Sequence, residues 1–264
     1  MTKRAATKRQ TREHGILDSR DFMEESKVRR LHAPHNERHR EGSGGWSPNP
    51  SNDDREQGYL KTLKPKSEGQ IEMMEAIDTH NLVMALGPAG TGKTYLAVAK
   101  AVEALEAGRI GRIVLSRPAV EAGESIGFLP GDMEDKLAPY LRPLYDALSD
   151  RLSMKRVKAL MAEGLIEIAP IGYMRGRTLN NAFIVVDEAQ NCTYVQLKML
   201  LTRLGWHSTM VVTGDPQQSD LLPGISGLAD ISARLEAIDE IAVVRLAERD
   251  IVRHPLVASM IGVI

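Results

Sequence analysis

The sequence contains little cysteine and no long apolar run, and each absence excludes a class of protein. A single cysteine among 264 residues excludes an internal disulfide framework and is compatible with a reducing cytoplasm, where we expect the protein to reside. No stretch approaches the roughly 18 apolar residues that a membrane span requires. Charged residues at the amino terminus are followed by no apolar region, so the chain does not begin like a secretory signal.

The charges are nearly balanced in total but unevenly distributed. The formal net charge is -1, so the charge of the whole chain favours no particular partner. The first forty residues are rich in Arg and Lys and poor in bulky apolar side chains, and Gly, Pro, Asn and Ser are frequent in the stretch that follows. We therefore predict a disordered basic arm over residues 1–60. The arm could hold RNA or DNA phosphates, or it could be a solvated tail without a specific partner.

After the arm, short apolar runs alternate with helical patterns. Strands are predicted over residues 81–86, 112–116, 165–169, 182–186, 209–213 and 241–244. Helices are predicted over residues 67–77, 95–105, 132–148, 153–163, 194–204 and 226–237, the third of them interrupted by Pro139 and Pro143. This alternation predicts an α/β domain over residues 61–264, with a mostly parallel sheet and helices on both of its faces.

The first predicted strand leads into a glycine-rich loop, Gly-Pro-Ala-Gly-Thr-Gly-Lys-Thr over residues 87–94. The loop satisfies every defined position of the phosphate-binding pattern G-x-x-x-x-G-K-[ST], and it lies between a strand and a helix, as the pattern requires. Glycines let successive backbone N–H groups point into one concavity, and the following helix adds the positive end of its dipole. Lys93 would reach the β- and γ-phosphates, and the Thr94 hydroxyl would ligate Mg²⁺.

Two further predicted strands end in acidic or amide side chains. Residues 182–186 are all apolar and are followed by Asp187 and Glu188, which would hold Mg²⁺ and orient the attacking water, respectively. A strand-terminal turn would also contain Asp, but the phosphate loop upstream favours the functional interpretation. Residues 209–213 lead into Gly-Asp-Pro-Gln-Gln, where a glutamine could sense the γ-phosphate. Cys192 follows the acidic pair and is interpreted as structural.

Two loops contain arginines that are suited to phosphate contact. Arg117 opens the loop over residues 117–124, at the carboxyl end of a predicted strand, where open α/β sheets bind ligands. Arg175 and Arg177 flank a glycine and follow the aromatic residue Tyr173, so they could contact phosphates or stack on bases. For this second loop, a polar surface segment without a ligand is the alternative.

In combination, these motifs closely resemble the PhoH family of bacterial and phage ATPases. The resemblance extends from about residue 60 to residue 264, and the joint pattern is far more specific than the phosphate loop alone. The other motifs are Ser-Arg-Pro-Ala-Val-Glu-Ala-Gly-Glu (116–124), Gly-Phe-Leu-Pro-Gly-Asp (127–132), Tyr-Met-Arg-Gly-Arg-Thr (173–178), Val-Asp-Glu-Ala-Gln-Asn (186–191) and Gly-Asp-Pro-Gln-Gln (214–218). The last motifs are also similar to those of superfamily 1 helicases. The resemblance implies a RecA-like P-loop NTPase core.

The resemblance also implies which residues bind ATP and Mg²⁺. Gln70 is similar to the Q-motif glutamine that reads the adenine edge. Lys93 and Thr94 match the Walker A pair, and Asp187 with Glu188 matches Walker B. The implied nucleotide-binding set is Gln70, Gly87, Pro88, Ala89, Gly90, Thr91, Gly92, Lys93, Thr94 and Tyr95.

Further roles are implied for residues outside this set. Gln218 matches the helicase glutamine that couples the state of the γ-phosphate to movement. Arg117 falls where helicases contact single-stranded nucleic acid. Arg253, with Arg249 as a second choice, is a candidate arginine finger. A superfamily 1 motor has two RecA-like domains, whereas this chain has room for one, so we expect neighbouring subunits to complete the sites of a homo-oligomeric ring, with a hexamer as the expected form.

Three functions are compatible with these residues. The first is an ATP-driven motor or remodeller of single-stranded nucleic acid, with RNA as the expected strand. The second is an ATPase switch that acts on a protein partner without moving along a strand. The third is a small-molecule kinase, which would need an acceptor site in place of a water-orienting glutamate. A GTPase is disfavoured because no Asn-Lys-x-Asp motif is present.

Overall fold

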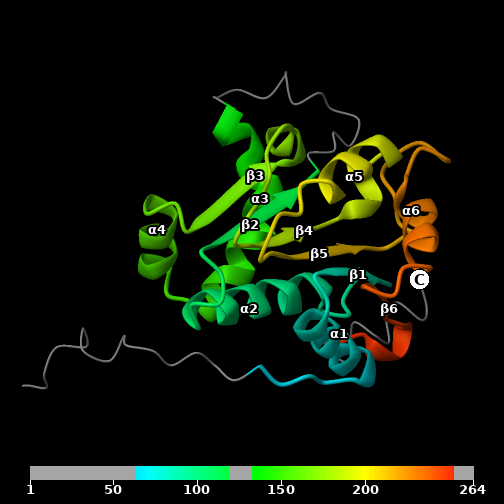
Figure 1. The fold of residues 1–264 in the computed structure, drawn as a ribbon, viewed down its shortest axis with the longest axis horizontal. Coiled ribbons are helices and arrows are strands. Elements are labelled where there is room, and N and C mark those ends of the chain that lie inside the picture. Colours follow the sequence, from blue (N-terminus) through cyan, green and yellow to red (C-terminus); the bar gives the residue numbers. More distant parts are fainter. Residues whose placement is uncertain (1–62, 119–132, 253–264) are drawn as a thin grey trace, which may run out of the picture. The chain divides into compact units, whose positions relative to one another are not determined.

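A parallel sheet forms the centre of the fold (Figure 1). The computed structural model describes residues 63–118 and 133–252. In this described part, six strands form the sheet in the order β3-β2-β4-β5-β1-β6, and every pairing is parallel. The strands are β1 (Leu82–Leu86), β2 (Arg112–Arg117), β3 (Ile166–Pro170), β4 (Ala182–Val186), β5 (Thr209–Gly214) and β6 (Ile241–Arg245).

Helices connect successive strands, as a parallel sheet requires. They are α1 (Glu68–Thr79), α2 (Lys93–Glu106), α3 (Met133–Arg151), α4 (Met154–Ala162), α5 (Tyr194–Leu201) and α6 (Leu228–Leu235), with short 3-10 helices η3 (Ile171–Met174), η4 (Ala189–Asn191) and η5 (Glu248–Asp250). Side-chain caps define several helix starts: the hydroxyls of Ser67, Ser153 and Thr193 accept hydrogen bonds from backbone N–H groups in the first turn of α1, α4 and α5. The predicted α/β class and its parallel sheet are confirmed.

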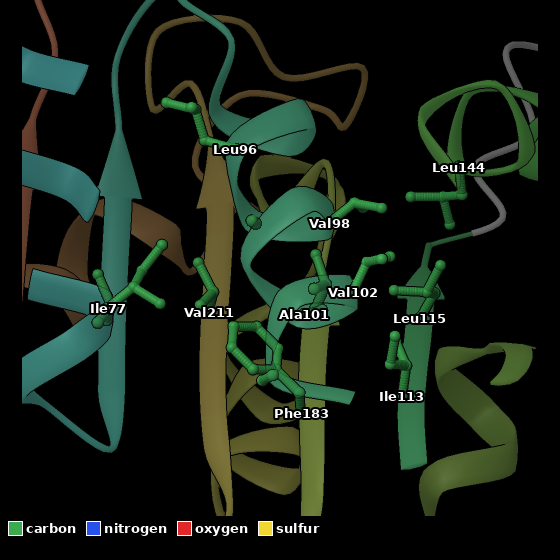
Figure 2. Close-up of a cluster of buried hydrophobic side chains, with 14 of the residues drawn as sticks. Ile77, Leu96, Val98, Ala101, Val102, Ile113, Leu115, Leu144, Phe183 and Val211 are labelled. Atoms are coloured by element: carbon green, nitrogen blue, oxygen red, sulfur yellow. The ribbon is translucent and has the colours of Figure 1, made fainter. Parts of the chain in front are cut away.

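The sheet is buried on both faces because successive side chains of each strand point to opposite sides. One face packs against α1, α2, α3 and α4, and the other against η3, α5 and α6. Figure 2 shows part of the first cluster, to which α2 contributes Leu96, Val98, Ala101 and Val102, and the sheet contributes Ile113, Leu115, Phe183 and Val211. Burial on both faces explains why the inner strands β1 and β4 are continuously apolar in the sequence.

The predicted interruption of the third helix by prolines is wrong. Helix α3 runs without a break from Met133 to Arg151 and includes positions 139 and 143. A proline in a helix interior removes one backbone hydrogen bond and costs about 3 kcal/mol. Leu144 and Leu148 of this helix are fully buried in the first core cluster, and burying each contributes roughly 1.5–3 kcal/mol. The burial of these two leucines is therefore comparable in size to the cost of the two prolines, and it favours the unbroken helix.

Some sequence predictions lie outside the described residues. They include the basic arm over residues 1–60, positions 119–124 of the Arg117 loop, and Arg253. In the described part of the chain, no helix has the length and apolar character to cross a lipid bilayer.

Cys192 provides a test of the packing of the second core cluster. Its side chain is fully buried, and burial raises the pKa of the thiol to about 12. Because the thiolate is the reactive form, we expect folded protein near neutral pH to resist alkylation by iodoacetamide and protein unfolded in guanidinium to react fully. Intact-mass spectrometry before and after unfolding measures both. Stoichiometric alkylation of the folded protein would contradict the described burial.

Candidate nucleotide-binding site

The glycine-rich loop connects β1 to α2 and adopts a backbone that only glycine accommodates easily. Gly87, Gly90 and Gly92 have φ values of 140°, 89° and 83°, in the region that side chains disfavour. At Gly87 a Cβ atom would also lie 2.3 Å from the backbone oxygen of Leu246. The loop therefore needs glycine for its curvature and, at Gly87, for its close contact with the chain after β6.

Lys93 folds back over this loop. Its Nζ atom donates to the backbone oxygens of Gly87 (2.6 Å) and Pro88 (2.8 Å) and lies 3.4 Å from the Thr91 hydroxyl. Burial lowers the pKa of the Lys93 ammonium, and the carboxylates of Asp215, Glu188 and Asp187 oppose that shift. The loop thus holds a largely desolvated cation whose partners are neutral carbonyls, and an anion would be a stronger partner.

Asp187 brings together residues from three parts of the chain. Its Oδ1 atom accepts hydrogen bonds from the Thr94 hydroxyl at 2.5 Å and from the Thr213 hydroxyl at 2.7 Å. Thr94 lies in the first turn of α2, Asp187 follows β4, and Thr213 lies in β5. Asp187 is only 3% exposed, so its carboxylate oxygens and the two hydroxyl oxygens lie close together in a buried position. Such oxygens are the ligands that Mg²⁺ prefers.

Glu188 has a left-handed backbone, with φ 53° and ψ 42°. A non-glycine residue in this conformation costs roughly 1 kcal/mol or more, and such strain is concentrated at functional sites. The carboxylate has two partners: Oε1 accepts from Arg117 Nη2 at 3.2 Å, and Oε2 accepts from Gln190 Nε2 at 2.5 Å. The turn therefore presents Glu188 beside the phosphate loop with both carboxylate oxygens in hydrogen bonds.

Two adjoining cavities flank the loop. The larger, about 320 Å³, is lined by loop residues and by the ends of β4 and β5, including Lys93, Thr94, Asp187, Glu188 and Gln218. The smaller, about 200 Å³, is lined by Leu63, Lys64, Lys66, Gln70, Leu96 and Val252. Gly90, Gly92 and Tyr95 line both cavities. The two volumes therefore meet at the phosphate loop and provide a polar and a more apolar compartment.

Gln70 is buried beside the smaller cavity. Its Nε2 atom donates to the backbone oxygen of Thr91 at 3.0 Å, and its Oε1 atom accepts from the backbone N–H of Lys66 at 2.8 Å. Tyr95 lies between the cavities, and its hydroxyl donates to Asp150 at 2.8 Å. The predicted adenine-reading residue is thus connected directly to the phosphate loop.

The segment after β6 closes the other side of the smaller cavity. The backbone N–H of Val252 donates to the Gly90 oxygen at 3.0 Å. Asp250, only 2% exposed, accepts from the backbone N–H groups of Gly69 (3.2 Å) and Ala247 (2.8 Å). Burial acts to raise the pKa of Asp250, but these donors and the Ser67 hydroxyl outweigh burial and lower it. Helix α1, the loop and the segment after β6 are therefore joined by hydrogen bonds, and those of Asp250 are buried.

The predicted arginines occupy three different environments. Arg117 pairs with Glu188 at the larger cavity, 4.0 Å from Asp187 Oδ2. Arg177 forms two hydrogen bonds with Glu167, at 2.5 and 2.7 Å, and these lower the pKa of that carboxyl. Arg175 is exposed. The structure therefore brings Arg117 to the site, engages Arg177 in a separate ion pair, and leaves Arg175 on the surface.

Sequence reasoning missed two residues of the site. Thr213 donates to Asp187, and Gln190 donates to Glu188 and accepts from the backbone N–H of Asp215 at 3.1 Å. The available signal was weak: Thr213 is a polar residue at the end of an apolar strand, and Gln190 lies two positions after Glu188.

Comparisons with known sequences identify close relatives. The sequence model of the family described as "PhoH-like protein" matches residues 62–264. The chain is 56% identical over 202 residues to the PhoH-like protein of Bacillus subtilis (strain 168), covering 76% of this chain and 63% of the relative. It is 45% identical over 194 residues to Protein PhoH of Escherichia coli (strain K12), covering 72% and 55%. The chain therefore spans somewhat more than half of the length of these relatives.

Solved structures with a similar arrangement are much more distant in sequence. The large terminase of a thermophilic bacteriophage is 11% identical with a TM-score of 0.46, covering 75% of this chain and 50% of the terminase. The Pif1 helicase of Candida albicans is 13% identical with a TM-score of 0.35, covering 71% and 41%.

Gly87 offers a test of the loop geometry. We expect Gly87→Ala to lower the free energy of unfolding by at least ~2 kcal/mol, because the new Cβ meets the Leu246 oxygen and the backbone is held at positive φ. Gly172→Ala is the matched control, since a Cβ there meets nothing within 4 Å, and it should change stability by less than about 0.5 kcal/mol. Urea unfolding measures both variants; equal stabilities would contradict the described contact.

Proposed function

Because the chain belongs to the PhoH-like protein family, we propose that it binds ATP with Mg²⁺ and hydrolyses it at the larger cavity. One observation carries the proposal. The phosphate loop, the Thr94–Asp187 pair and Glu188 line a single cavity, and a second cavity bordered by Gln70 adjoins it. A triphosphate with its cation fits the chemistry of the first compartment, and a purine base fits the second.

Each residue then has a defined task. Backbone N–H groups of residues 89–94, at the amino terminus of α2, bind the phosphates. Lys93 exchanges its carbonyl partners for phosphate oxygens. Thr94 and Asp187 would hold Mg²⁺, which when bound neutralises charge on the β- and γ-phosphates. Gln70 would contact the edge of the base.

Glu188 and Gln218 act on the γ-phosphate in this proposal. Glu188 orients the attacking water and accepts its proton, and its presence favours hydrolysis over transfer to a small-molecule acceptor. Gln218 lines the same cavity and would sense whether the γ-phosphate is present. Residues after β5 would in this way report the nucleotide state to the rest of the domain.

We also propose that the protein uses ATP hydrolysis to move along or remodel single-stranded nucleic acid, with RNA as the expected strand. The support is the carboxyl edge of the sheet, where Arg117 ends β2 and where Arg175 and Tyr173 are exposed in the loop after β3. An exposed aromatic ring beside a cation suits stacking on bases and contact with phosphates. Single-stranded RNA should then stimulate ATP hydrolysis, whereas a switch that acts only on a protein partner would not respond.

The proposed site needs a transition-state cation in addition to Lys93, and we assign that role to Arg253 of a neighbouring subunit. Such head-to-tail contacts close into a ring, here a hexamer. Light scattering with and without ATP should give the mass of a closed oligomer, and Arg253→Ala should keep ATP binding while losing ~10³-fold in turnover. A strictly monomeric protein with full ATPase activity would exclude this arrangement.

Two variants test the ATPase assignment itself. Lys93→Ala should weaken ATP binding and abolish turnover, because the variant lacks the full positive charge of the lysine that would contact the phosphates. Glu188→Gln should bind ATP normally and lose at least ~10²-fold in turnover, about 2.7 kcal/mol of barrier. Fluorescent-nucleotide binding and phosphate release measure the two steps separately. Normal turnover by Glu188→Gln would favour a phosphotransferase.

A further inference from the structure

The Glu188 carboxylate is held by two residues of opposite character. Gln190 contacts one carboxylate oxygen with a neutral amide, and Arg117 contacts the other with a cationic guanidinium. A carboxylate that shares its charge with a guanidinium polarises a water less strongly than one held by neutral donors. The two partners therefore have opposite consequences for a reaction in which Glu188 must attract a proton from water.

Gln190 is a fixed partner. It is 5% exposed, its side-chain oxygen accepts from the backbone N–H of Asp215, and its backbone oxygen accepts from the Ser219 hydroxyl at 3.0 Å. A Cβ at Gly214 would lie 2.8 Å from the Gln190 side-chain oxygen. These contacts join Gln190 to the segment after β5, so it can hold Glu188 at a constant position relative to the phosphate loop.

Arg117 is a partner that can be released. Its side chain is 20% exposed. Among the described residues it also donates to the backbone oxygen of Tyr140 at 3.3 Å and lies 4.0 Å from Asp187 Oδ2. It is also the last residue of β2 and lies at the carboxyl edge of the sheet. A partly exposed ion pair of this kind is weak, and a phosphate, which offers several acceptor oxygens, can compete for the guanidinium.

We propose that Arg117 is a positioning residue that restrains Glu188, and that the phosphodiester backbone of a bound single strand relieves the restraint by taking over the guanidinium. This inference rests on the proposed ATPase function and gives it a means of regulation. A strand at the carboxyl edge of the sheet leaves Glu188 on its Gln190 support alone, with its charge free to orient water. Arg117 then both contacts the strand and controls the rate.

The test is a steady-state ATPase assay on the full chain with Mg²⁺, with and without an oligouridine RNA. Arg117→Gln should raise the basal kcat about two- to fivefold, the factor that corresponds to one partly exposed ion pair, and RNA should add little further. The KM for ATP should stay within about twofold, because ground-state binding is unchanged. Arg117→Lys, which keeps the charge without the planar fork, should fall between wild type and Arg117→Gln.

Two further variants separate this effect from a structural one. Arg245→Gln is the matched control: Arg245 also ends a strand and pairs with an exposed glutamate, Glu236, at 2.7 Å, and its loss should leave basal and stimulated rates unchanged. Gln190→Leu should lower kcat by roughly two- to tenfold, the value of a single hydrogen bond, with KM unchanged. The expected result is therefore a higher kcat for Arg117→Gln and a lower kcat for Gln190→Leu.

Each remaining outcome has a defined meaning. If Arg117→Gln has a lower basal kcat and an unchanged melting temperature, the proposal that Arg117 restrains Glu188 is overturned. Undiminished RNA stimulation in that variant, or a wild-type rate that RNA never changes, overturns the role of the strand. If wild-type protein hydrolyses no ATP, or if Lys93→Ala hydrolyses it equally well, the proposed function itself fails and the inference fails with it.

Discussion

The organisation of the site depends on the hydrogen bonds that the Asp187 carboxylate accepts from two threonine hydroxyls. One of its oxygens accepts from Thr94 in α2 and from Thr213 in β5, while its own backbone follows β4. In a parallel sheet all strands end at the same edge, and here β5 lies directly between β4 and β1. This order places the phosphate loop, the acidic pair and the Gly-Asp-Pro-Gln-Gln segment side by side, although they are far apart in the sequence.

Buried charge explains why these residues form one electrostatic unit. Lys93 is 9% exposed and Asp187 is 3% exposed. Desolvation disfavours the charged state of the Lys93 amine, and the carboxylates of Asp215, Glu188 and Asp187 favour it. Because a buried charge is costly unless it is paired, the loop lysine and the acidic strand ends depend on one another.

Local sequence patterns were sufficient to predict most of the strands and helices. Each predicted strand is present, since continuous apolar runs can be buried on both faces of a parallel sheet. The hydroxyls of Ser67 and Ser153 cap α1 and α4, close to the predicted starts of these helices. The misjudged element is α3, where local proline chemistry favoured a break and the burial of Leu144 and Leu148 in the core maintained the helix.

The pairing of the charged side chains was less predictable. Arg117 and Arg177 both follow or flank strand ends in loops that contain glycine, and the sequence assigns them the same kind of role. In the fold, Arg177 meets Glu167 through two hydrogen bonds, while Arg117 meets Glu188 at the cavity. Gln190 was overlooked because an amide in a strand-terminal turn has no distinctive pattern until its two partners, Glu188 and the Asp215 backbone, are brought to it.

The sequence by itself determined the α/β class, the phosphate loop and the acidic pair, because glycine spacing, apolar runs and their order are local properties of the chain. Only the tertiary structure decided that Arg117 pairs with Glu188, and that the segment after β5 holds the Gln190 side chain that also contacts Glu188. Those contacts join residues that are 71 positions apart for Arg117 and Glu188 and 25 apart for Gln190 and Asp215. Their geometry depends on the order of strands in the sheet, and no local pattern encodes that order.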